Sequence, residues 1–97
     1  MFFRRRTAES GPRFLKPDGQ NAFRMRVKTA RRGEVVEIRM TKSGDISPDE
    51  GGYFVRKHVV GPKFYDRATV EVRFERNYAN PRATVEGGEV VPLSEWE

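Results

Sequence analysis

The chain contains no cysteine and a single histidine. Without cysteine it can form no disulfide framework, no thiolate metal site and no cysteine nucleophile. Zinc sites usually need three or four nitrogen or sulfur ligands, which His58 alone cannot supply. The sequence also holds neither a Gly-x-Ser-x-Gly nucleophile elbow nor a phosphate-binding glycine loop. We therefore expect no catalytic residue, no metal and no cofactor, and we predict that the protein is not an enzyme.

Long apolar runs and helical periodicity are missing as well. No stretch approaches the roughly 20 apolar residues of a membrane-spanning helix. The residues that follow the arginine triplet at 4–6 are polar, unlike the apolar core of a secretory signal. Charged residues make up 34% of the chain, whereas about 25% is usual for soluble domains. These absences predict a thin core in a cytoplasmic protein that is soluble or peripheral.

The sequence does contain period-two alternation, the pattern of half-buried strands. Apolar and charged residues alternate at 23–27, 36–40 and 70–74. We expect residues 21–41 to form an antiparallel hairpin, with further strands at 53–60, 68–76, 82–86 and 89–93. Because the connections are short, the predicted fold class is mostly β, a small antiparallel barrel or two-layer sandwich of five to six short strands. The alternation does not decide between barrel and sandwich.

The same pattern predicts a core and two turns. The residues expected to be buried together are Phe23, Val27, Val36, Ile38, Val70, Val72 and Phe74. Residues 47–50 read Ser-Pro-Asp-Glu, the form of a helix capping box, so we expect at most one helical turn there. The glycine pair at 87–88 is expected to join the last two strands as a two-residue hairpin.

Residues 1–20 show neither strand nor helix periodicity and contain two prolines and two glycines. We expect an extended basic N-terminal arm over 1–20, followed by a single small β domain over 21–97. Because the arm carries no core-type pattern, we expect it to be dispensable for folding and needed for association.

Positive charge is concentrated in the first part of the chain. The net charge is +5, yet residues 1–42 carry 12 basic and 4 acidic side chains, and residues 43–97 carry 7 and 10. Arginine predominates, and its planar guanidinium group suits phosphates and carboxylates. We predict that an anionic partner contacts the arm, one strand face and one hairpin tip. The predicted contact residues are Arg4, Arg5, Arg6, Arg13, Arg24, Arg26, Lys28, Arg31, Arg32 and Arg39.

Two readings of the function follow from these features. The first is a non-catalytic binding module, a small accessory subunit that docks onto the protein subunits of a larger assembly through its basic arm and cationic sheet face. Phe2 and Phe3 would be hydrophobic anchors. The alternative is an autonomous β domain that binds RNA or single-stranded DNA. Such domains place aromatic rings beside cations, but here the aromatic residues Tyr53, Phe54, Phe64, Tyr65 and Tyr78 lie in the acidic half of the sequence. Peripheral contact with a membrane or a membrane complex also stays open.

Overall fold

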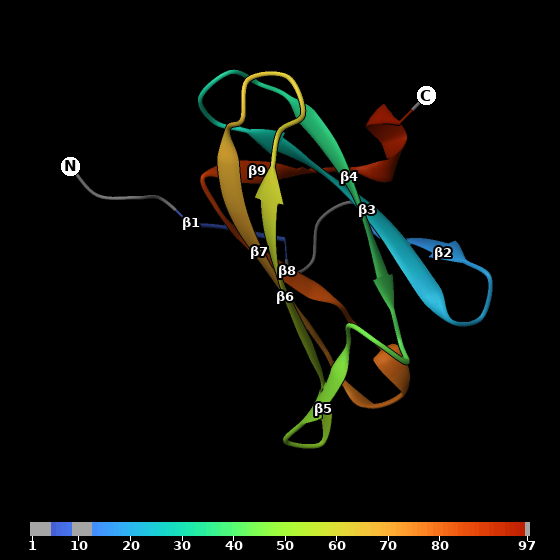
Figure 1. Ribbon diagram of the computed structural model, residues 1–97. Coiled ribbons are helices and arrows are strands. Elements are labelled where there is room, and N and C mark those ends of the chain that lie inside the picture. The colour runs from blue at the N-terminus through green and yellow to red at the C-terminus, as the bar shows by residue number, and fades with distance from the viewer. Residues whose placement is uncertain (1–4, 9–12, 97) are drawn as a thin grey trace.

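Two antiparallel sheets form the architecture of the computed structural model, which describes residues 5–8 and 13–96, with side chains placed from residue 13. The first sheet has the strand order β1-β8-β7-β6-β5; the second has the order β2-β3-β4, and β9 also pairs with β3 (Figure 1). The elements of the described residues are β1 (Arg5–Ala8), β2 (Lys16–Asp18), β3 (Ala22–Thr29), β4 (Val35–Thr41), β5 (Ser47–Asp49), β6 (Gly52–Val60), β7 (Arg67–Phe74), the short 3₁₀ helix η1 (Arg76–Tyr78), β8 (Arg82–Glu86), β9 (Gly88–Val91) and the 3₁₀ helix η2 (Leu93–Glu95).

The predicted mostly-β class is confirmed, and so is the hairpin within residues 21–41. Strands β3 and β4 pair in antiparallel register, with Met25 opposite Ile38 and Val27 opposite Val36. The number of strands was predicted wrongly, because the described chain has nine. The additional strands β1, β2 and β5 have only three or four residues each, too few to show alternation. Within residues 5–8 and 13–96, no helix has the length and apolar character needed to cross a bilayer.

The inner faces of the two sheets share one hydrophobic core. As predicted, Val27, Ile38, Val70, Val72 and Phe74 are buried in it. The other two predicted core residues, Phe23 and Val36, lie near the ends of their strands. They are only half-buried and pack against the core. In the part of the chain that the structure describes, β4 pairs with β3 alone, so the strands do not close into a barrel.

Residues 13–20 of the expected arm belong to the second sheet and the core. Phe14 and Leu15 are only 4% and 7% exposed and lie in the main core cluster. Directly after them, β2 pairs with the first residues of β3. Residues 5–8 form β1 at the edge of the first sheet, next to β8. Two adjacent apolar residues cannot show periodicity, which is why the sequence did not reveal this contribution to the core.

Residues 47–50 form no helical turn, within the prediction of at most one, but the capping-box pattern did not indicate that they form β5 and the start of a tight hairpin. Pro48 fits because β5 is an edge strand, where a missing N–H breaks no ladder hydrogen bond. Glu50 and Gly51 connect β5 to β6 with φ angles of 47° and 84°. Two successive positive φ angles are typical of a type I′ turn, which matches the twist of paired strands.

The predicted hairpin at 87–88 is also wrong, because β8 and β9 belong to different sheets. β8 pairs with β7, whereas β9 pairs with β3. The Gly87 carbonyl accepts a hydrogen bond of 2.9 Å from Ala30 N–H. A Cβ atom on Gly87 would lie 2.7 Å from the Arg67 carbonyl oxygen, and one on Gly88 would lie 2.5 Å from the Lys28 oxygen. The two glycines therefore form a tight corner that carries the chain from one sheet to the other.

Candidate functional site

The predicted cationic strand face is the outer face of the second sheet, and acidic side chains share it. Asp18 Oδ2 lies 3.1 Å from Arg24 Nε and 2.8 Å from Arg39 Nε. Glu37 Oε1 lies 3.0 Å from Arg26 Nε. Hydrogen bonds from Arg39 and Arg24 hold the pKa of Asp18 below its ordinary value. The three arginines are therefore engaged with carboxylates of the same sheet, and the face is not an unbroken cationic stripe.

The C-terminal segment covers part of this face. The guanidinium carbon of Arg26 lies 4.3 Å from the centre of the Trp96 ring, and Lys16 Nζ lies 6.0 Å from it. Trp96 Nε1 donates a 3.4 Å hydrogen bond to the Val91 carbonyl. An aromatic ring leaves the charge of a cation in place, so it is the carboxylate of Glu37, 3.0 Å from Arg26 Nε, that makes this guanidinium less available to an external anion. Lys28, another predicted contact, is exposed and lies opposite Glu89 in the register of β3 and β9.

The predicted contact residues of the N-terminal arm are described only in part. Arg5 and Arg6 are in β1, paired with Glu86 and Val85 of β8, and the positions of their side chains are not described. Arg13 is exposed, and its carbonyl accepts a 2.8 Å hydrogen bond from the amide that follows Pro92. The predicted anchors Phe2 and Phe3, together with Arg4, lie outside the described residues.

The tip of the β3–β4 hairpin is joined to the loop between β6 and β7, at the upper end of the molecule in Figure 1. The buried carboxylate of Asp66 accepts hydrogen bonds from the Thr29 hydroxyl (2.9 Å) and the Arg32 amide (2.7 Å). The Glu34 carboxylate accepts hydrogen bonds from the amides of Lys63 (2.8 Å) and Phe64 (3.1 Å). Two loops about 30 residues apart in the sequence thus form one unit.

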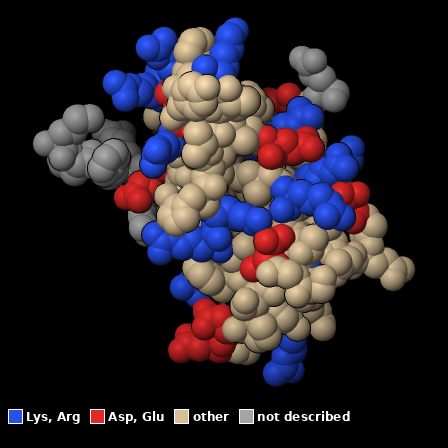
Figure 2. Space-filling model, viewed as in Figure 1, with Lys and Arg blue, Asp and Glu red and all other residues tan. Residues whose placement is uncertain are grey.

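We call the surface of this unit the basic-aromatic end. Its residues are Arg31, Arg32, Val35, Val60, Lys63, Phe64, Tyr65 and Arg67. The Phe64 ring lies 4.9 Å from the guanidinium carbon of Arg32 and 5.6 Å from Lys63 Nζ. Figure 2 shows uncharged surface at the upper end of the molecule with lysine and arginine side chains on either side. The structure therefore joins the basic hairpin tip to an exposed apolar surface.

Tyr65 is the most exposed large hydrophobic residue of the described chain, at 73%. Its φ angle of 60° lies in the left-handed region, which bulky residues rarely adopt. Two backbone hydrogen bonds of the loop hold this conformation. Tyr65 N–H donates to the Gly61 carbonyl oxygen (3.1 Å), and Gly61 N–H donates to the backbone carbonyl oxygen of Asp66 (2.7 Å). Strain of this kind costs about 1–3 kcal/mol and persists where the surrounding structure enforces it. Here it presents an aromatic side chain to solvent.

The sequence pointed to Arg31 and Arg32 but missed the remaining members of the basic-aromatic end. In the sequence, the aromatic residues lie far from the basic segment, and this separation was an argument against nucleic-acid binding. For Phe64 this separation does not persist in the fold, because the Arg32 guanidinium group lies over its ring. One local signal was available, since Phe64 and Tyr65 follow Gly61-Pro62 in a turn, where polar residues are the usual choice.

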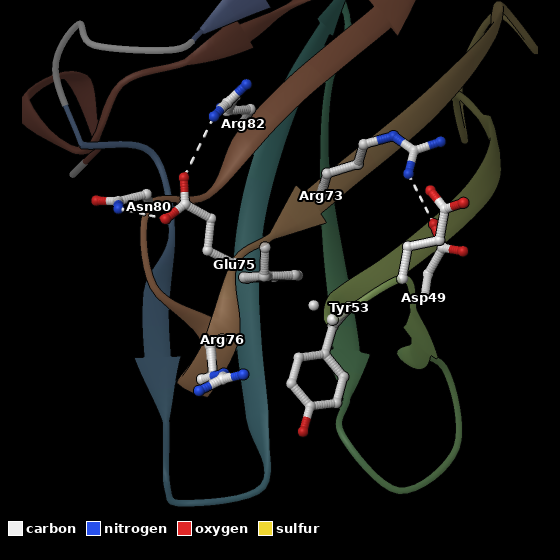
Figure 3. A pocket seen from close by; sticks show the side chains of 11 residues that line it. Asp49, Tyr53, Arg73, Glu75, Arg76, Asn80 and Arg82 are labelled. Atoms are coloured by element: carbon white, nitrogen blue, oxygen red, sulfur yellow. Dashed lines mark hydrogen bonds and ion pairs between the residues drawn. The ribbon is translucent and has the colours of Figure 1, made fainter.

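A shallow hollow of about 270 Å³ lies at the other end of the molecule, between the β5–β6 turn and the loop after β7 (Figure 3). Three arginines line it, but carboxylates accompany them. Arg73 pairs with Asp49 at 2.8 Å, and Arg82 pairs with Glu75 at 3.2 Å. Because two of its arginines are paired with carboxylates, the hollow presents less uncompensated positive charge to an anion than the basic-aromatic end does.

The sequence matches no model of a protein family, no curated protein and no solved structure. The function must therefore be inferred from the geometry of the chain.

The junction under the basic-aromatic end can be tested with Asp66→Ala. The substitution removes Asp66 Oδ2, the single oxygen that accepts the hydrogen bonds from the Thr29 hydroxyl and the Arg32 amide. We expect a loss of about 1–3 kcal/mol in the free energy of unfolding, measured by urea denaturation, because buried donors lose an acceptor. Asp49→Ala, at an exposed ion pair with Arg73, should cost less than about 1 kcal/mol. Equal losses for both variants would contradict the assignment.

Proposed function

We propose that this chain is a non-catalytic binding module, an accessory subunit that docks onto an anionic surface of a larger assembly. The docking surface is the basic-aromatic end, in place of the sheet face expected from the sequence. The single observation that carries the proposal is the orientation of charge at this end. Arg31, Arg32 and Lys63 are exposed, while the carboxylates of half-buried Glu34 and buried Asp66 accept hydrogen bonds from amides of the loops.

The remaining titratable groups support a binding role over a catalytic one. The His58 ring has Thr69 Oγ1 at 3.3 Å as its partner, and no carboxylate of the described side chains is hydrogen-bonded to it as an orienting group for a general base. Among the described residues, no three histidine, aspartate or glutamate side chains gather as metal ligands would. The expected cytoplasmic location stays a prediction.

A second candidate function is binding of single-stranded nucleic acid at the same end. The observation that favours it is the exposed Tyr65 side chain in the loop whose Asp66 is hydrogen-bonded to the Arg32 amide, since aromatic rings and cations together bind bases and phosphates. The partners of the two functions differ in one accessible property. Nuclease treatment removes a nucleic-acid partner and leaves a protein assembly intact.

The proposal is tested by replacing two matched sets of cations in the full chain. One set is Arg31, Arg32 and Lys63 of the basic-aromatic end; the other is Arg24, Arg26 and Arg39 of the sheet face. Each set is changed to alanine, and sedimentation of native cell extracts measures the fraction of the protein bound in large complexes. We expect the first set to reduce that fraction about tenfold, equivalent to about 1.4 kcal/mol of binding free energy. The second set should leave it nearly unchanged.

Two results would change this assignment. If the sheet-face variant loses the complex and the other variant keeps it, the docking surface is misplaced. If nuclease releases the wild-type protein from the complex, the nucleic-acid function replaces the accessory-subunit function.

A further inference from the structure

Exposed apolar side chains of the described residues are gathered at one end of the molecule. The large hydrophobic residues with high exposure are Val35 (52%), Val60 (50%), Phe64 (46%) and Tyr65 (73%). All four belong to the basic-aromatic end. Phe64 and Tyr65 are adjacent in one loop, and Val60 ends the strand that leads into it. Scattered exposed apolar residues are normal on protein surfaces, but a concentration of them at one loop marks a contact with a partner or a membrane.

Four cations accompany these side chains: Arg31, Arg32, Lys63 and Arg67. The nearby carboxylates of Glu34 and Asp66 accept hydrogen bonds from amides of the loops, and Asp66 also accepts one from the Thr29 hydroxyl. The surface thus presents aromatic and aliphatic groups together with positive charge. Aromatic rings settle at the headgroup level of a bilayer, and cations close to an anionic leaflet are attracted to it.

We propose that the basic-aromatic end binds the headgroup region of an anionic lipid bilayer. The inference rests on the proposed docking function and names the anionic surface. Phe64 and Tyr65 lie in a loop at the extremity of the fold (Figure 1), so they can enter the headgroup layer while both sheets stay in water. Because the loop is tied down by the hydrogen bonds of Glu34 and Asp66, insertion requires no reorganisation of the domain.

The geometry favours lipid over nucleic acid. Base stacking needs free aromatic faces, yet the Phe64 ring already has Arg32 and Lys63 close to it. Nucleic acid also makes no use of Val35 and Val60, whose exposed side chains have no flat face on which a base could stack. A bilayer surface accommodates all these groups, since aliphatic side chains enter the acyl boundary and cations stay with phosphates. A protein partner remains an outcome of the test.

The expected binding is reversible. Each arginine or lysine close to an anionic surface contributes about a fivefold increase in partitioning, and salt screens this contribution. Two aromatic side chains in a headgroup layer add to it through their buried apolar area. Stable anchoring usually needs two membrane signals, so a single loop surface should give exchange between bilayer and water.

The test is co-sedimentation of the full chain with vesicles at about 0.1 M salt. One set of vesicles contains phosphatidylcholine alone, and the other contains phosphatidylcholine and phosphatidylserine in equal parts. We expect binding to the mixed vesicles only. Arg31→Ala with Arg32→Ala should weaken it about 25-fold, and Phe64→Ala with Tyr65→Ala should weaken it about tenfold. The matched control, Arg24→Ala with Arg26→Ala on the sheet face, should change it less than about fivefold.

Thermal melts must show that each variant is folded; if the aromatic pair unfolds, Tyr65→Ser alone takes its place, because that side chain is the most exposed of the four. Three results would overturn the membrane inference. The first is no binding to the mixed vesicles, and the second is an equal loss in the sheet-face control. The third is tighter binding to a single-stranded oligouridylate than to lipid. If vesicles fail while the alanine set of the basic-aromatic end still loses its native complex, the docking function stands and its partner is a protein.

Discussion

Replacing Phe14 and Leu15 by alanine is expected to unfold the protein. Both side chains lie in the main core cluster, 4% and 7% exposed. Truncation of a buried phenylalanine costs about 3–5 kcal/mol and that of a buried leucine about 2–5 kcal/mol. A small domain has a total stability of about 5–15 kcal/mol, so the two losses together approach or exceed it. Urea denaturation of the single variants and circular dichroism of the double variant measure the effect.

The control for this experiment is Val35→Ala. It also shortens an apolar side chain, but Val35 is 52% exposed and should lose less than about 1 kcal/mol. A double variant of Phe14 and Leu15 that folds with nearly normal stability would restore the arm to the dispensable role expected from its composition. The expected unfolding would show that the first strands of the second sheet depend on residues ahead of position 21.

Gly87→Ala is expected to destabilise the fold far more than Gly51→Ala, although the two glycines have almost the same backbone. Their φ angles are 86° and 84°, so alanine at either position incurs a left-handed strain of about 1–2 kcal/mol. At Gly87 the new Cβ would also lie 2.7 Å from the Arg67 carbonyl oxygen, whereas at Gly51 nothing lies within 4 Å. Overpacking of this kind adds about 1–3 kcal/mol.

The free energies of unfolding of the two variants, measured in urea, give the contact contribution as a difference. The shared strain cancels in that difference, which makes Gly51→Ala a matched control. Equal destabilisation would mean that the corner between β8 and β9 has room for a side chain. In that case the close approach of the two sheets at Gly87 would not explain why glycine stands there.

The candidate site was predictable only in part. The turn between β3 and β4, with its arginines, follows from the alternation on either side and from the glycine at position 33. The second loop of the basic-aromatic end could not be assigned to it, because no local pattern reports that Glu34 reaches the amides of Lys63 and Phe64. Such contacts depend on how the two sheets pack, which is a property of the whole chain.

The sequence by itself determined the local structure of the longer strands. Period-two alternation reports which side chains face a core, and it correctly indicated the hairpin of β3 and β4 and the buried face of β7. It also determined the excess of arginine near the N-terminus. These properties are local, since successive side chains of a strand point to opposite faces whatever the partner strands are.

Tertiary structure alone decided which charges are neutralised and which stay exposed. Asp18 on β2 contacts both Arg24 on β3 and Arg39 on β4 because β2 and β4 flank β3 in the second sheet, and no spacing in the sequence requires that order. Likewise, the corner at Gly87 sends β9 to β3 instead of back along β8. Strand order and loop contacts arise from the packing of residues far apart in the chain. For that physical reason the basic-aromatic end exists only in the folded protein.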